Sequence, residues 1–110
     1  MALKKHWYHI LLALAEGPAH GAEIRRRVER HTRRSLELYP AMLYGSLEDL
    51  LERAWIGEVD EGCGRPPEAS DRTRYLALAP AGREALRAET EELQEVVGIA
   101  RSLLAGEVAP

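Results

Sequence analysis

The chain has 110 residues, of which 45% are hydrophobic and 30% charged, and its formal net charge is −3. This length and composition predict one globular domain, and the sequence has neither an apolar run long enough to span a bilayer nor a signal-peptide pattern. The single cysteine, Cys63, excludes an intrachain disulfide framework, so we expect a cytoplasmic protein.

The first two predicted helices lie in residues 5–16 and 19–31. Apolar side chains occupy almost every side of the first helix, which indicates burial against the domain on one side and against a partner on another. A Gly-Pro pair then ends this helix. In the second helix, Ile24 and Val28 are spaced to face inward.

The third predicted helix, residues 40–53, begins at Pro40, which suits the first helical position because its missing N–H would have no helical partner. Four leucines form an apolar stripe along this helix: Leu43, Leu47, Leu50 and Leu51. Small and mixed residues form the opposite face, which fits close approach to another surface: Ala41, Met42, Gly45, Ser46 and Asp49.

After this helix the pattern predicts two strands, residues 55–59 and 73–78, joined by a Gly/Pro-rich loop. Trp55 begins the first strand, and we expect it in the core. The last predicted helix, residues 80–104, is about 37 Å long at about 1.5 Å per residue, too long to lie against so small a domain throughout. Its heptad-like apolar seam predicts pairing with a helix of a second copy.

These elements predict a mainly α fold with a small β-hairpin. We expect a winged helix-turn-helix in residues 1–79 and a dimerisation helix in residues 80–110, within one compact unit. A winged helix-turn-helix places one helix in the DNA major groove, so the fold indicates DNA binding.

The negative net charge is unevenly distributed. Residues 1–53 contain nine Lys or Arg against seven Asp or Glu, a balance of +2, whereas residues 76–110 contain three against six, a balance of −3. Because salt screens charges beyond about 8–10 Å, a basic face can bind phosphate while a distant acidic helix points away from DNA.

Four segments of the chain resemble the PadR-type transcriptional regulators, a family named for repressors of phenolic acid stress responses. They are YHILLALAEGPAHGAEI (residues 8–24), YPAMLYGSLEDLLERAWI (39–56), TRYLAL (73–78) and APAGREAL (79–86). The single helix after the wing is similar to the short subgroup of the family. Tyr39 and Met42 stand where the family often has Ser or Thr, so the usual hydroxyl cap and phosphate contact are missing.

The resemblance implies that the helix at residues 40–53 is the recognition helix of a homodimeric repressor on a pseudo-palindromic operator. We expect DNA contacts from the second helix, the segment after it, the recognition helix and the wing: His20, Gly21, Arg33, Arg34, Tyr39, Pro40, Ala41, Met42, Tyr44, Gly45, Ser46, Arg65, Arg72 and Arg74. The alternative for Met42 and Tyr44 is that they are partial core residues. The alternative for the wing arginines, Arg65, Arg72 and Arg74, is that they belong to a solvated loop.

The dimer interface is predicted along the first and last helices: Trp7, Leu11, Leu86, Leu93, Val97, Ala100 and Leu104. By resemblance, a small aromatic effector is expected between the subunits, lined by Trp7 with Leu93, Val96 and Val97 opposite. The alternative is that Trp7 is an ordinary residue of the dimer core.

Enzymatic function is not predicted, since the sequence contains no serine-histidine-acid set and no phosphate-binding glycine loop. His6 and His9 share a helix face without a further metal ligand at suitable spacing, so no metal and no cofactor are expected. The main rival to a DNA-binding regulator is a winged-helix module for protein–protein contact. The acidic balance and the recognition helix without arginine on its predicted DNA face support that rival.

Overall fold

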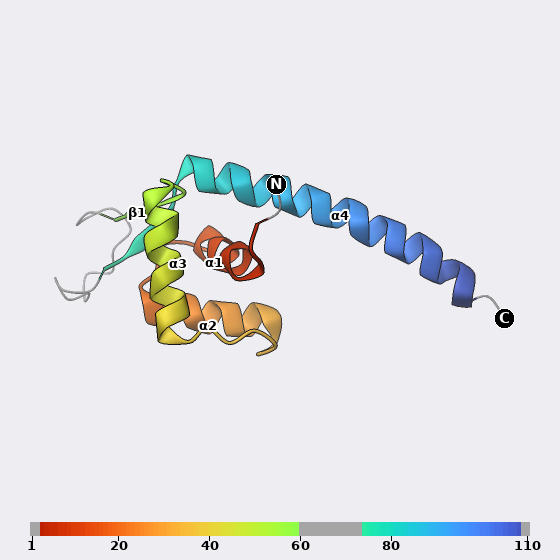
Figure 1. The fold of residues 1–110 in the computed structure, drawn as a ribbon, viewed down its shortest axis with the longest axis horizontal. Helices are drawn as coiled ribbons and strands as arrows, with labels where there is room; N and C mark the ends of the chain where they lie inside the picture. The colour runs from red at the N-terminus through yellow and green to blue at the C-terminus, as the bar shows by residue number, and fades with distance from the viewer. Residues whose placement is uncertain (1–2, 60–73, 109–110) are drawn as a thin grey trace.

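The computed structural model describes residues 3–59 and 74–108 of the chain. In chain order, its elements are α1 (Lys5–Ala15), α2 (Gly21–Thr32), α3 (Pro40–Glu52), β1 (Ile56–Glu58), β2 (Leu76–Leu78) and α4 (Pro80–Val108) (Figure 1). The predicted fold class, mainly α with a small hairpin, is confirmed. The helices agree closely with the predicted ranges, while each strand has only three residues and is shorter than expected.

Local backbone chemistry sets where the helices end. After α1, Gly17 adopts a φ of 139°, a conformation that favours glycine, and its N–H donates to the carbonyl of Leu14 at 3.1 Å. His20 caps α2, because its Nδ1 accepts a hydrogen bond from the backbone N–H of Glu23 at 3.3 Å. At the start of α3, Tyr39 makes no side-chain cap, as predicted.

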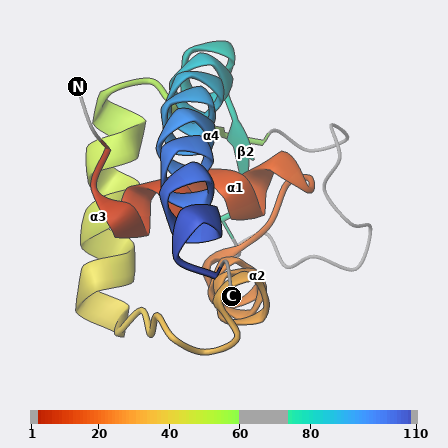
Figure 2. The same ribbon diagram turned by 90° about the vertical axis from the view of Figure 1, so that its right-hand side faces the viewer.

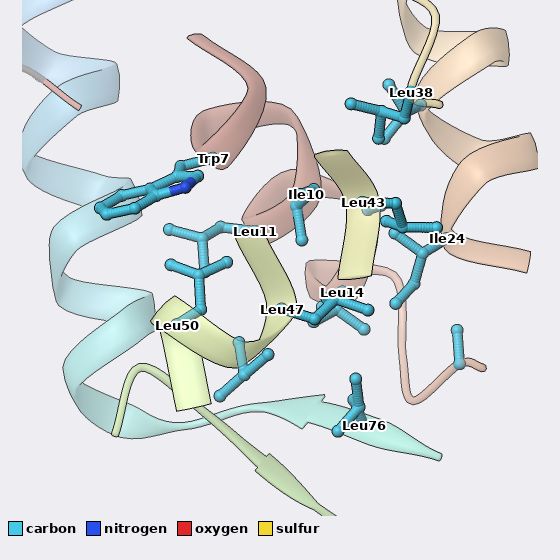
Figure 3. Packing of buried hydrophobic residues seen from close by; sticks show 14 of the residues in the cluster. Trp7, Ile10, Leu11, Leu14, Ile24, Leu38, Leu43, Leu47, Leu50 and Leu76 are labelled. Atoms are coloured by element: carbon cyan, nitrogen blue, oxygen red, sulfur yellow. The ribbon is translucent and has the colours of Figure 1, made fainter. Parts of the chain in front are cut away.

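The hydrophobic core forms around α1, which supplies Ile10, Leu11 and Leu14 (Figure 3). Figure 2 shows α1 in the middle of the domain, between α3 and β2 and above α2. Ile24 of α2 and Leu50 of α3 are fully buried in the same cluster. Three helices therefore share one core, which gives α3 a rigid support.

The hairpin and the start of α4 are joined tightly to the end of α3. Ile56 pairs with Leu78 in the antiparallel register, and the carbonyl of Trp55 accepts the N–H of Ala79 at 2.9 Å. A Cβ on Gly82 would lie 2.0 Å from that same carbonyl oxygen, so only glycine fits there. The orientation of α4 is thus set by contact with the segment that follows α3.

Beyond this junction, α4 extends away from the domain (Figure 1), and the molecule measures 61 × 26 × 24 Å. Among the α4 residues whose burial the structure describes, Leu86 is the last that is buried, and every residue from Thr90 to Gly106 is exposed. Within the described residues, none of the helices has the length and apolar character that a membrane crossing requires.

Candidate nucleic-acid interface

The first turns of α3 present an uncovered face. Tyr39, Met42 and Tyr44 are 63%, 41% and 55% exposed. Pro40, Ala41 and Gly45 are also exposed, because the leucine stripe turns the opposite side of the helix toward the core. Met42 and Tyr44 are therefore surface residues and not the partial core residues considered as an alternative.

Ser46 lies elsewhere than predicted. It is only 5% exposed, and it follows Leu43 by three residues and precedes Leu50 by four, which puts it on the buried stripe. Its hydroxyl is not available to a base or a phosphate in this arrangement. The prediction placed Ser46 on the face opposite the leucine stripe, whereas the width of the buried arc decides its position.

The N-terminus of α2 lies beside the exposed face of α3. A Cβ on Gly21 would meet the hydroxyl oxygen of Tyr44 at 3.0 Å, so this glycine lets the two helices approach closely. The ring of His20 packs edge-to-face on Tyr75 at 5.3 Å between centroids. An open hollow of about 310 Å³ lies between α2, α3 and β2. Its lining residues are His20, Gly21, Ala22, Tyr44, Leu47, Arg74 and Leu76.

The six arginines of α2 and the segment after it divide into three groups. Arg27 points inward, where it donates to the carbonyls of Ala13 and Gly17 at 3.1 and 2.8 Å and so ties α2 to the end of α1. Arg25, Arg26 and Arg30 form exposed ion pairs with Glu29, Glu23 and Glu16, respectively. Arg27 therefore has a structural role.

Arg33 and Arg34 are the third group, and both are exposed. Their backbones are left-handed, with φ of 51° and 64°, which turns the chain from α2 back toward α3. No salt bridge to either of them occurs among the described residues. With Arg26, Glu29 and Arg30 they line an open hollow of about 560 Å³. A second hollow, of about 300 Å³, brings Arg25 and Arg26 next to Pro40 and Tyr44 of α3.

At the base of the wing, Arg74 is held by two carboxylates. Its guanidinium donates to Glu48 of α3 at 2.9 Å and to Glu58 of β1 at 2.6 Å. The hydrogen bonds that Arg74 donates to Glu48 and then to Glu58 raise the pKa of Arg74, which stays charged. Sequence reasoning missed both carboxylates, although Glu48 follows Tyr44 by one helical turn. Arg65, Arg72 and Cys63 lie outside the described residues.

The predicted interface residues fall into two classes. Trp7, Leu11 and Leu86 are 6%, 0% and 9% exposed, so the chain buries them itself. Leu11 in particular has no surface left for a partner, which corrects its assignment to the interface. By contrast, Leu93, Val97 and Leu104 are 42%, 46% and 54% exposed, and Ala100 is exposed beside them.

A second apolar row on α4 was not predicted. Val96, Ile99 and Leu103 are 61%, 62% and 68% exposed. At about 100° per residue, this row lies beside the heptad seam, and together the two rows cover roughly 160° of the helix circumference. The spacing of three and four residues along this row was the signal that could have revealed it.

Trp7 is surrounded by its own chain. Its ring packs edge-to-face on Trp55, which is partly buried, at 6.2 Å between centroids. Lys4 and Arg53 lie over the Trp7 ring at 4.8 and 4.9 Å from its centroid. An adjoining hollow of about 450 Å³ is lined by Lys4, Trp7, Asp49, Glu52 and Arg53, and not by the α4 residues predicted to face Trp7.

The two histidines of α1 do not form part of a metal site in the described portion of the chain, where His, Cys, Asp and Glu form no suitable group. Nδ1 of His9 is buried without a hydrogen-bond partner. Burial, followed by the charges of Lys5 and His31, lowers the pKa of His9. Burial and Lys4 lower the pKa of His6 in the same way.

Comparison with known proteins places this geometry in a family. Residues 10–88 match the model described as the Transcriptional regulator PadR-like family. An uncharacterized 37.1 kDa protein in transposon TN4556 of Streptomyces fradiae is 35% identical over 89 residues. The alignment covers 81% of the chain but 23% of that protein, so the chain spans about a quarter of the length of this curated relative.

Solved structures share the arrangement of elements. A transcriptional regulator from Clostridium thermocellum has a TM-score of 0.66 at 20% identity, over 94% of this chain and 92% of that one. RosR of H. salinarum has a TM-score of 0.66 at 21% identity, over 96% and 93%. F93 from STIV, a winged-helix DNA-binding protein, has a TM-score of 0.67 at 16% identity, over 88% and 96%. At these identities the likeness establishes the winged-helix fold.

Proposed function

Because the chain belongs to the PadR-like family of transcriptional regulators, we propose that it is a homodimeric repressor with no catalytic activity of its own. In this proposal α3 of each copy enters the major groove of a pseudo-palindromic operator in double-stranded DNA. The half-sites then lie about 34 Å apart, one turn of the duplex. We assign a repressor role because the family is named for repressors.

The observation that carries the DNA-binding proposal is the uncovered face at the start of α3, where Pro40 and Tyr44 share a hollow with Arg25 and Arg26 of α2. Tyr39 and Tyr44 are both more than half exposed, so two aromatic rings lie open on this face. Arg33 and Arg34 are exposed in the turn that leads into α3. Such a surface offers apolar contacts to base edges together with charge for the phosphates.

Contacts to the DNA backbone complete this proposal. The hollow between α2, α3 and β2 brings the N-terminus of α2, with Gly21, next to the Tyr44 hydroxyl and Arg74. A helix N-terminus favours phosphate, whereas the Arg74 guanidinium already binds Glu48 and Glu58. We propose that this hollow follows the backbone of one strand, with Arg65 and Arg72 as further contacts from the wing.

Dimerisation is proposed through the free half of α4. Its exposed apolar rows are larger than the isolated hydrophobic side chains that a monomer normally shows. Two copies of the seam formed by Leu93, Val97, Ala100 and Leu104 can pack as a coiled coil. The adjacent row of Val96, Ile99 and Leu103 adds apolar surface for a further helix of the partner.

We also propose that a small aromatic effector binds between the subunits and releases the operator. The exposed side chains of Leu93, Val96 and Val97 supply apolar surface for such a molecule. Trp7 is the predicted aromatic neighbour, and its remaining exposed surface is small. Release of a labelled operator by small aromatic compounds, compared between the wild type and Val96→Asp, tests this part.

A second candidate, a protein–protein module without specific DNA binding, is favoured by the later turns of α3. Glu48, Asp49 and Glu52 are all exposed there and would repel phosphate. Only the DNA-binding regulator should bind specific DNA sequences with an affinity that falls as salt rises, so DNA binding over a salt series distinguishes the two candidates.

The test is a fluorescence anisotropy titration of promoter fragments, including the region upstream of the protein's own gene, over a salt series. We expect sub-micromolar binding that is tighter than binding to random DNA and falls steeply with salt. Changing both Arg33 and Arg34 to Gln should weaken binding to every sequence and reduce the slope of log K against log salt by about 1 to 2.

Arg83→Gln is the matched control, because Arg83 is exposed at the start of α4, at the opposite end of the domain from the basic turn (Figure 1). It should leave affinity and slope unchanged. Binding no tighter to promoter fragments than to random DNA at low salt would reject the repressor and favour the protein–protein module.

A further inference from the structure

Glu48 occupies an unusual place on the recognition helix. Within residues 40–48, the exposed positions are Pro40, Ala41, Met42, Tyr44, Gly45 and Glu48. Only Tyr44 and Glu48 among them carry side chains that can form hydrogen bonds. The side chain of Glu48 is 64% exposed, one helical turn beyond Tyr44. Tyr44 and Glu48 therefore supply the hydrogen-bonding side chains of these positions, and Glu48 is the one that is charged.

An acidic side chain this close to DNA needs a reason to be tolerated, because phosphate repels it. Arg74 supplies part of that reason, since its guanidinium donates to Oε1 of Glu48 at 2.9 Å and offsets part of its charge. The same guanidinium donates to Glu58 on β1 at 2.6 Å. Arg74 thus holds the Glu48 side chain from the wing, which restricts its rotamers before any DNA is bound.

A carboxylate offers about four acceptor positions on its two oxygens, and the bond from Arg74 uses one oxygen. Acceptor capacity remains for a donor in the major groove. Cytosine presents only an amine donor there, whereas guanine presents two acceptors and thymine an acceptor with a methyl group. Adenine presents an amine donor beside its N7 acceptor. The N7 acceptor repels a carboxylate, whereas a side-chain amide can bind both groups.

We propose that Glu48 is a specificity-determining residue that accepts a hydrogen bond from the exocyclic amine of a cytosine in each half-site, and that Arg74 is its positioning residue. This inference rests on the proposed function, because it requires α3 in the major groove. Two copies of the chain then read one cytosine in each half of the operator.

The experiment is selection of binding sites from randomised duplexes by the full chain, followed by competition titrations at each position. The wild type should prefer cytosine at one position per half-site by roughly tenfold. In Glu48→Gln the preference at that position should move to adenine, because the amide can pair with both the amine and N7 of adenine. Other positions should keep their preferences.

Glu52→Gln is the matched control, since Glu52 is exposed on the same helix one turn further on. It removes the same charge and should leave the base preference intact. Arg74→Gln should reduce the discrimination for cytosine in the wild-type background but should not change base preference further in the Glu48→Gln background. A purely structural role for Arg74 would not produce this dependence.

Three results would overturn the inference. If Glu48→Gln binds every sequence more tightly with the same base preferences, the carboxylate only repels phosphate. If the wild type selects no sequence over random DNA, the proposed function fails, and the role of Glu48 fails with it. Specific binding by the wild type with an unchanged preference in Glu48→Gln rejects the role of Glu48 alone.

Discussion

The winged-helix domain and the free half of α4 use similar apolar residues in opposite ways. In the domain, Ile10 and Leu50 have no exposed surface, because α1, α2 and α3 enclose one core. In α4 beyond Thr90, Ile99 and Leu103 are 62% and 68% exposed. The contrast teaches that the chain completes its core alone, whereas half of its longest helix presents a surface suited to another molecule.

Charge separates the same two regions. Exposed arginines gather at the turn after α2, near the start of α3. On α4, Arg87 pairs with Glu84 and Glu91, and the helix as a whole is acidic. Because screening limits each patch to its surroundings, the acidic helix does not cancel the basic surface. The net charge alone is therefore no argument against the proposed DNA binding.

The largest expected effect tests the core side of this comparison. Leu50→Ala should lower the free energy of unfolding by about 2–5 kcal/mol, because the cavity at a fully buried site cannot be refilled. Leu104→Ala, the same substitution on the free half of α4, should cost far less in dilute solution. Urea denaturation at low protein concentration measures both, and equal losses would contradict the division into two regions.

The next effect tests the α4 side. Val97→Glu places a charge on the predicted seam and should raise the dimer dissociation constant roughly 100-fold, or about 2.7 kcal/mol. Sedimentation equilibrium measures it. Ser102→Glu adds the same charge to the opposite side of the helix and should leave the dimer intact. A dimer that survives Val97→Glu unchanged would show that the seam is not the interface.

The smallest effect concerns His9, on the helix at the centre of the core. Burial and the charges of Lys5 and His31 hold the pKa of His9 below its ordinary value of 6.5. As the pH falls through that value, the unfolded chain binds a proton that the folded chain resists, so stability present at neutral pH is lost. The melting temperature should therefore fall between pH 7.5 and pH 5.5.

His9→Leu removes this titration. Over the same pH interval, the melting temperature of the variant should fall less than that of the wild type, by a difference on the order of 2 °C. His6 shifts in the same direction and is present in both proteins, so the difference isolates His9. Partial desolvation raises the pKa of Glu16, but hydrogen bonds and charges from Arg30 and His31 outweigh it and lower the pKa overall, so Glu16 does not titrate in this range. Equal losses in the two proteins would show that His9 is not the sensitive group.

Much of the fold was determined by local sequence. Pro40 starts α3 and Gly17 ends the turn after α1, because each residue restricts or permits particular backbone angles. The leucine spacing in α3 and the heptad in α4 predicted which sides are apolar, since a helix repeats every 3.6 residues. Four segments carried the family resemblance, and the family match confirms it.

Tertiary structure decided what each apolar or charged side chain does. Ser46 and Leu11 are buried because neighbouring elements widen the covered arc, which no helical period specifies. Arg27 turns inward to the carbonyls of Ala13 and Gly17, whereas Arg33 remains exposed, although both belong to one basic run. The link from Arg74 to Glu48 joins residues 26 positions apart, and only the packing of the wing against α3 brings them together. Local sequence therefore determines the elements, and contacts distant in sequence determine which residues remain free to meet DNA or a second copy.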